Sequence, residues 1–134
     1  MQMKRFGTIG MLVLLPCMLS GCAAALLAGG AAVGAGTFAF VNGQLQTTEE
    51  VPLDRAWAAS VKAMDQMQFS IKKREKDALH ARVTAMDSRK RYIVIDLNRE
   101  NSYLTKITIR VGMFGDEKAS ELILSKIRRN LKKR

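Results

Sequence analysis

The sequence predicts an α+β fold, in which an antiparallel sheet of about five strands carries two helices on one face. Apolar residues recur at helical spacing over residues 53–67 and again after residue 116, whereas the runs between them alternate apolar and polar residues. The turns that separate these runs are short, which favours an antiparallel meander. We therefore expect the order β-α-β-β-β-β-α in a domain that spans residues 38–134.

Residues 38–48 alternate in polarity and predict the first strand. The Asn42-Gly43 pair inside this run is a hairpin signal, but the Gly-rich residues ahead of it offer no clear partner strand. Pro52 then marks the start of the first helix, and Asp54 adds negative charge to its first turn. Its apolar stripe comprises Leu53, Trp57, Val61 and Met64, with Ala56 and Ser60 beside them, and we expect Trp57, Met64 and Met67 in the core.

Four strand-like runs follow, over residues 69–75, 79–85, 91–97 and 103–111. The residues expected on the buried side are Leu79, Ala81, Val83, Ala85, Ile93, Ile95, Leu97, Tyr103, Ile107, Ile109 and Val111. Gly112 and Gly115 break the last strand, and Asp116 is a suitable N-cap for the closing helix. Its expected apolar stripe comprises Ala119, Leu122, Ile123, Ile127 and Leu131, and the basic residues at its end complement the helix dipole.

The N-terminal residues 1–21 have the layout of a secretory signal peptide. Lys4 and Arg5 supply the positive start, and residues 6–20 form an apolar segment too short for a comfortable membrane span. The segment ends in Leu19-Ser20-Gly21-Cys22, which resembles the lipobox of bacterial lipoproteins. This resemblance implies diacylglyceryl attachment at Cys22, cleavage before it, and acylation such as palmitate on the new amine. The alternative is an uncleaved anchor with an ordinary cysteine.

The residue after the cysteine indicates whether such a lipoprotein resides in the inner or the outer membrane. In Gram-negative lipoproteins an Asp there retains the protein in the inner membrane, and this chain has Ala23, so the resemblance implies the periplasmic side of the outer membrane. Residues 22–37 read as an Ala/Gly-rich tether between lipid and domain. The spacing of Gly30 and Gly34 leaves open a helix that packs in the membrane instead.

The charge balance is strongly basic. Formal net charge is +10, and it falls to +8 when Lys4 and Arg5 leave with the leader. For an exported chain this indicates an anionic lipid surface, an anionic polymer or an acidic envelope protein as partner, and excludes nucleic acid. A merely solvated surface explains the charge equally well. The expected contacts lie on the outward side of the strands: Lys72, Arg74, Arg82, Lys106 and Arg110.

The sequence contains few of the residues and motifs that catalysis requires. The domain has one histidine, His80, and no cysteine beyond Cys22, so it offers no thiolate nucleophile and no Cys-based metal site. It contains neither a GxSxG nor an HExxH motif nor a Walker loop. We therefore expect no enzyme activity, no cofactor and no metal.

Three segments carry a further resemblance: residues 51–57 (VPLDRAW), 69–77 (FSIKKREKD) and 109–117 (IRVGMFGDE). With the lipobox and the Ala/Gly segment, they resemble a family of small bacterial lipoproteins classed as a domain of unknown function. The strand order is also similar to that of helix-grip domains, some of which bind lipids or take part in outer-membrane assembly. These likenesses imply a fold and a location in the cell envelope, and no activity.

Two functions remain open. We expect a membrane-anchored lipoprotein that acts as a non-enzymatic accessory or assembly factor. The alternative is a module that binds a lipid or a small apolar ligand in a helix–sheet cleft. A fully packed space between Trp57, Ile95, Ile107 and Ile123 would argue against this alternative.

Overall fold

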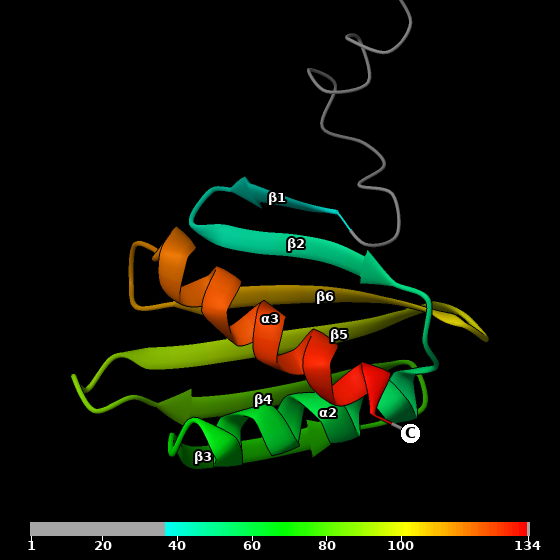
Figure 1. Cartoon of the computed structure of the whole chain (residues 1–134), viewed down its shortest axis with the longest axis horizontal. Coiled ribbons are helices and arrows are strands. Elements are labelled where there is room, and N and C mark those ends of the chain that lie inside the picture. The colour runs from blue at the N-terminus through cyan, green and yellow to red at the C-terminus, as the bar shows by residue number, and fades with distance from the viewer. Residues whose placement is uncertain (1–36, 134) are drawn as a thin grey trace, which may run out of the picture. The chain divides into compact units, whose positions relative to one another are not determined.

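The computed structural model describes residues 37–133 and shows one antiparallel sheet with two helices. The elements are β1 (Phe38–Val41), β2 (Gln44–Glu49), α2 (Leu53–Gln66), β3 (Ser70–Lys76), β4 (His80–Met86), β5 (Tyr92–Asn101), β6 (Leu104–Val111) and α3 (Glu117–Lys132). The strand order is β1-β2-β6-β5-β4-β3. Both helices cover the same face, α3 over β2 and β6 and α2 over β3, β4 and β5 (Figure 1). The predicted α+β class is confirmed.

The first predicted strand is instead a hairpin, which raises the number of strands in the sheet from five to six. Asn42 and Gly43 both have positive φ, 52° and 76°, as a two-residue type I′ turn requires. β1 therefore folds back onto β2, with Phe40 opposite Leu45. The partner strand of β2 is therefore Phe38–Val41, which the sequence analysis had placed in the same strand.

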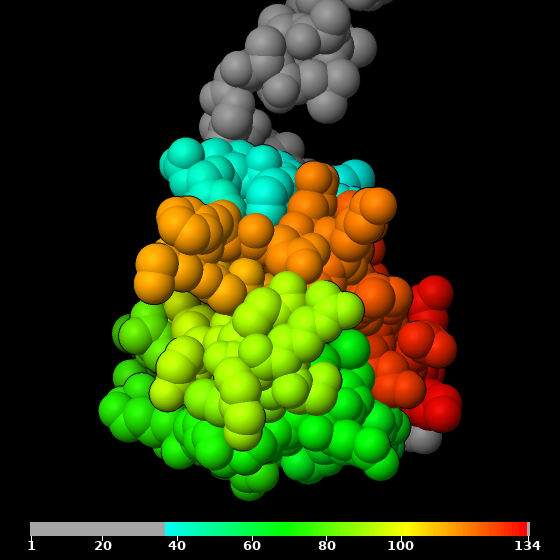
Figure 2. All heavy atoms as spheres, turned by 90° about the vertical axis from the view of Figure 1, so that its left-hand side faces the viewer, coloured from blue at the N-terminus to red at the C-terminus, as the bar shows by residue number. Residues whose placement is uncertain are grey.

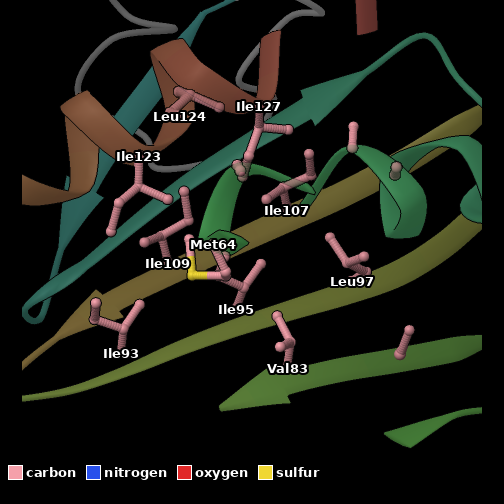
Figure 3. Close-up of a cluster of buried hydrophobic side chains, with 14 of the residues drawn as sticks. Met64, Val83, Ile93, Ile95, Leu97, Ile107, Ile109, Ile123, Leu124 and Ile127 are labelled. Atoms are coloured by element: carbon pink, nitrogen blue, oxygen red, sulfur yellow. The ribbon is translucent and has the colours of Figure 1, made fainter. Parts of the chain in front are cut away.

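The core lies between the sheet and the helices. Alternate residues of β4, β5 and β6 are fully buried beneath the helices, as the period of two predicts. Figure 3 shows Met64 of α2 and Ile123 of α3 directed toward Ile95 and Ile109 of the sheet. Met64 and Ile95 are 0% exposed, and Trp57 packs against this cluster from a half-buried position.

Some residues expected in the core are exposed. Leu79 precedes the first residue of β4 and is 65% exposed, and Tyr103 lies in the β5–β6 turn and is 69% exposed. Buried Thr105 takes the inward place at the start of β6, where its hydroxyl donates to the carbonyl of Val51. Both residues were expected inside because the apolar–polar alternation of the sequence continues one residue beyond the strand that the structure forms.

The closing helix begins where expected but turns a different side inward. The carboxylate of Asp116 accepts a hydrogen bond from the backbone N–H of Ala119, which confirms the N-cap. Leu124 is buried, whereas Leu122, expected in the stripe, is 64% exposed. Because α3 packs against β2 as well as α2, its buried side is rotated toward Leu124. Neither helix within residues 37–133 is long and apolar enough to span a membrane.

Candidate functional site

The sheet face away from the helices carries three of the five basic residues expected there. Arg82 alternates with buried Ala81 and Val83, and Lys106 and Arg110 alternate with the buried residues of β6. The register therefore points these three side chains away from the helices. Their position agrees with the sequence analysis.

The other two expected residues, Lys72 and Arg74, are displaced by a β-bulge. Pairing between β3 and β4 slips between Ile71 and Lys73, so Lys72 lacks a partner in the ladder. Arg74 lies opposite buried Val83 and therefore faces the helix side, contrary to expectation. The extra residue reverses the phase of the strand, and Lys73 takes the outward place instead.

Acidic residues compensate much of the charge on the outer sheet face. The Arg82 Nε lies 2.5 Å from Asp96 Oδ1, and this hydrogen bond raises the pKa of Arg82. Lys73 forms a 2.8 Å pair with Glu75, and their hydrogen bond lowers the pKa of that carboxyl group. The face thus carries acidic as well as basic groups, and of the expected basic residues that point outward there, Lys106 and Arg110 have no carboxylate partner among residues 37–133. It is not the uniformly positive surface that the sequence suggested.

His80 has a carboxylate partner on the same face. Its Nε2 lies 3.3 Å from the Asp96 Oδ1 that Arg82 also contacts. A histidine and an orienting carboxylate form part of a catalytic constellation, which also needs a nucleophile. Among residues 37–133, no hydroxyl group forms a hydrogen bond with His80, and no cluster of His, Cys, Asp and Glu is placed to hold a metal ion.

A cleft of about 220 Å³ opens at one end of the domain, between the β4–β5 turn and the first turns of α3. Figure 2 looks onto this end, with the β4–β5 turn in yellow-green at its centre and the β6–α3 connection in orange above it. The lining combines apolar residues with a charged rim: Met67, Phe69, Ile93, Val111, Ala119, Leu122 and Ile123, then Asp87, Ser88, Arg89 and Arg91. Sequence analysis missed this cleft because its walls come from four separate segments.

Arg91 organises the rim of this end cleft. Its guanidinium contacts Asp87 at 2.9 Å and Asp116 at 2.8 Å, which ties the β4–β5 turn to the start of α3. Burial raises the pKa of Asp87, but hydrogen bonds from the backbone and side chain of Arg91 and the backbone of Arg89 outweigh it and hold the pKa below its usual range. Hydrogen bonds from the backbone of Ala119 and then from Arg91 lower the pKa of Asp116.

A second charged surface lies on the outside of the helix layer. The two helices run side by side, and Arg55 donates a 2.8 Å hydrogen bond to the carbonyl of Leu131 near the end of α3. A shallow groove of about 230 Å³ between the helices is lined mostly by Arg55, Ala58, Ala59, Lys62, Asn130, Leu131 and Lys133. The sequence showed the basic end of α3 but not its juxtaposition with the basic residues of α2.

The chain enters the domain beside α3. The Arg128 guanidinium contacts Glu49 at 2.7 Å and Thr47 Oγ1 at 3.2 Å, and it also reaches the carbonyl of Thr37, to which the Thr47 hydroxyl donates. These contacts join the start of β1 to the C-terminal half of α3. The proposed lipidation residue, Cys22, lies outside the described residues.

Comparison with known proteins gives a family but no activity. No curated protein matches the chain. A family model matches residues 8–130, which include most of the described domain. The expectation of a family classed as a domain of unknown function is confirmed, while its lipoprotein character stays a prediction. The chain belongs to the family described as protein of unknown function DUF3568.

Proposed function

We propose that the protein is a bacterial envelope lipoprotein, anchored through lipid on Cys22, whose α+β domain is a non-enzymatic accessory or assembly factor. The observation that carries the proposal is the order of segments along the chain. A basic start and an apolar run end in Leu19-Ser20-Gly21-Cys22, and a segment without charge leads to the edge strand β1. This order suits a domain held near a membrane by its N-terminus.

The form of the domain supports an interaction role. Ile95, Ile107 and Ile123 are at most 1% exposed, so side chains fill the centre of the helix–sheet space. The charged groups lie on two open surfaces, the outer sheet face and the helix layer. Such surfaces suit docking on a protein complex or an anionic layer better than they suit enclosing a substrate.

The position of Ala23 supports the periplasmic side of the outer membrane as the location, if the source is Gram-negative. On this proposal the partners are the membrane itself and, through the domain, an envelope protein or anionic lipid. Of the residues first expected to make these contacts, Lys106 and Arg110 retain an outward position without a carboxylate partner among residues 37–133.

A second candidate is a module that binds a lipid or a small apolar ligand. The end cleft favours it, because an apolar floor formed by Met67, Phe69 and Ile93 meets a charged rim at Arg91. Its volume of about 220 Å³ is smaller than the pockets of about 300–1,000 Å³ that hold drug-sized ligands. A bound ligand would therefore be small, or only part of it would be buried.

The test of the anchor compares Cys22→Ser with Cys17→Ser, which changes the other cysteine of the leader. We expect Cys22→Ser to lose incorporation of a labelled fatty acid and to leave the membrane fraction, because two or three acyl chains supply the attachment. The Cys17→Ser variant should behave as the wild type does. A Cys22→Ser protein that remains labelled and membrane-bound would refute lipid anchoring at this residue.

The interaction role is tested by crosslinking in intact cells. Wild-type protein should enrich a defined envelope protein or anionic lipid relative to the Cys22→Ser variant. Recovery of no partner above background would count against an accessory role, and recovery of a stoichiometric apolar small molecule would favour the end cleft.

A further inference from the structure

Six cations lie along the outside of the helix layer, on α2 and on the C-terminal half of α3. We name these residues the helix-layer basic surface: Arg55, Lys62, Lys126, Arg129, Lys132 and Lys133. Arg55 and Lys62 lie on α2, and the remainder lie in the last turns of α3 or directly after it. The Arg55–Leu131 hydrogen bond and a 3.2 Å bond from Asn130 to the carbonyl of Ala59 hold the two helices together here.

These cations have no carboxylate within ion-pair distance in the part of the chain that the structure describes. This separates them from two other arginines of the domain. Arg82 is paired with Asp96, and Arg128 with Glu49. The dipole of α3 equals about half an elementary charge, so it does not account for four cations at one helix end.

The tether reaches the domain on this same helix. Arg128 belongs to the C-terminal half of α3, and its guanidinium contacts the carbonyl of Thr37, where the described chain begins. Fourteen residues lie between Cys22 and Thr37, and even a fully extended segment of this length spans at most about 50 Å. A lipid on Cys22 therefore keeps this end of the domain close to the bilayer, where a weak attraction acts at high effective concentration.

We propose that the helix-layer basic surface lies against the anionic headgroups of the bilayer that holds Cys22. The inference rests on the proposed function, since the anchor brings the bilayer into range. Each Lys or Arg near an anionic surface strengthens attachment by about five-fold. The outer sheet face, which carries the Lys73–Glu75 and Arg82–Asp96 ion pairs, then faces away from the bilayer and remains open to a protein partner.

The test uses full-length protein in vesicles and two reporter positions, each made in the Cys17→Ser background. Ser125→Cys places a fluorophore on the exposed side of α3, and Ser70→Cys places one at the start of β3, opposite outward-facing Met86. The vesicles are phosphatidylcholine with or without phosphatidylglycerol, and they contain a headgroup quencher. We expect strong quenching at residue 125 and little at residue 70, only in the anionic vesicles, and loss of this difference in high salt.

Charge reversal isolates the surface. The variant Lys126→Glu/Arg129→Glu/Lys132→Glu/Lys133→Glu should lose quenching at residue 125. The matched control Lys72→Glu/Lys73→Glu/Arg74→Glu/Lys106→Glu should keep it. Urea unfolding of both variants shows whether each one is folded. If the four-residue variant is misfolded, the single changes Lys132→Glu and Lys133→Glu replace it, and each should weaken quenching.

The possible failures are distinguishable. Wild-type protein that does not float with phosphatidylcholine vesicles would refute the lipid anchor. Protein that floats but is quenched equally at residues 70 and 125, or equally with and without phosphatidylglycerol, would overturn the docking proposal and leave the anchor intact. Persistence of quenching in the folded charge-reversed protein would overturn it too.

Discussion

At the scale of single residues, Gly43 and Gly115 bring two distant turns into backbone contact. A Cβ atom on Gly115 would overlap the carbonyl oxygen and Cα of Gly43, and one on Gly43 would overlap the carbonyl oxygen of Phe114. Gly115 also has a φ of 83°. The contact presents Phe114 at the surface, where it is 88% exposed. The hairpin turn therefore supports the loop before α3.

Gly115→Ala should destabilise the protein more than Gly112→Ala. Both glycines have positive φ, so each change brings backbone strain of about 1–2 kcal/mol. At Gly112 the nearest atom to the new methyl group would be Arg91 Cδ, 3.8 Å away, whereas at Gly115 backbone would have to move. Urea unfolding of both variants measures the difference. Equal losses would show that the Gly43–Gly115 contact relaxes without cost.

At the scale of elements, Arg91 links the β4–β5 turn to the N-terminus of α3. Its two carboxylate partners, Asp87 and Asp116, also accept backbone hydrogen bonds, one inside the turn and the other at the helix cap. A single guanidinium therefore completes two local motifs that the sequence predicts separately. Only the tertiary fold brings the turn and the helix cap close enough for the Arg91 side chain to contact both.

This link predicts a dependence on pH. The pKa values of Asp87 and Asp116 are lowered in the folded state, so their contribution is present above the unfolded value of about 3.9 and is lost as pH falls through the folded values. Arg91→Met leaves Asp87 buried without its ion pair and should cost about 1–3 kcal/mol at pH 7.

The loss caused by Arg91→Met should shrink once the pH is low enough to protonate Asp87. Unfolding curves at neutral and acidic pH measure this change. Arg82→Met, which breaks a more exposed pair, is the control and should cost at most about 1 kcal/mol at pH 7. An Arg91→Met loss that is the same at both pH values would contradict the role assigned to the carboxylates.

At the scale of the whole molecule, Arg128 joins the first strands to the last helix. It contacts Glu49 and Thr47 of β2 and the carbonyl of Thr37. These residues lie at opposite ends of the described chain, and the Glu49 side chain is only 12% exposed. The ion pair therefore closes the β1–β2 side of the sheet against α3.

Arg128→Met should destabilise the fold by about 1–3 kcal/mol, because it leaves a nearly buried carboxylate unpaired. Glu49→Gln in the same chain should recover part of this loss, since the neutral amide needs no countercharge. Arg129→Met removes an exposed cation that has no carboxylate partner among residues 37–133, and it should change stability by less than about 0.5 kcal/mol. Thermal unfolding of the three variants decides the point. A double variant no more stable than Arg128→Met would contradict the pairing.

Features that depend on residues only a few positions apart could be predicted from the sequence alone. The positions of both helices, the Asp116 cap and the alternating buried residues over 93–97 and 107–111 follow from local spacing and were predicted correctly. The order of leader, cysteine and uncharged segment also belongs to the sequence alone, and so the anchor at Cys22 was proposed from it.

Tertiary structure decided which faces these elements present. The bulge at Lys72 turned Arg74 toward the helix side, contact with β2 turned Leu124 inward, and pairing across strands placed Asp96 beside Arg82. Each outcome depends on register or packing between segments far apart in the chain, which no local spacing encodes. The candidate anionic contact is therefore the helix layer, whose six cations lack carboxylate partners among residues 37–133, and not the outer sheet face, where Lys73 and Arg82 are paired with carboxylates.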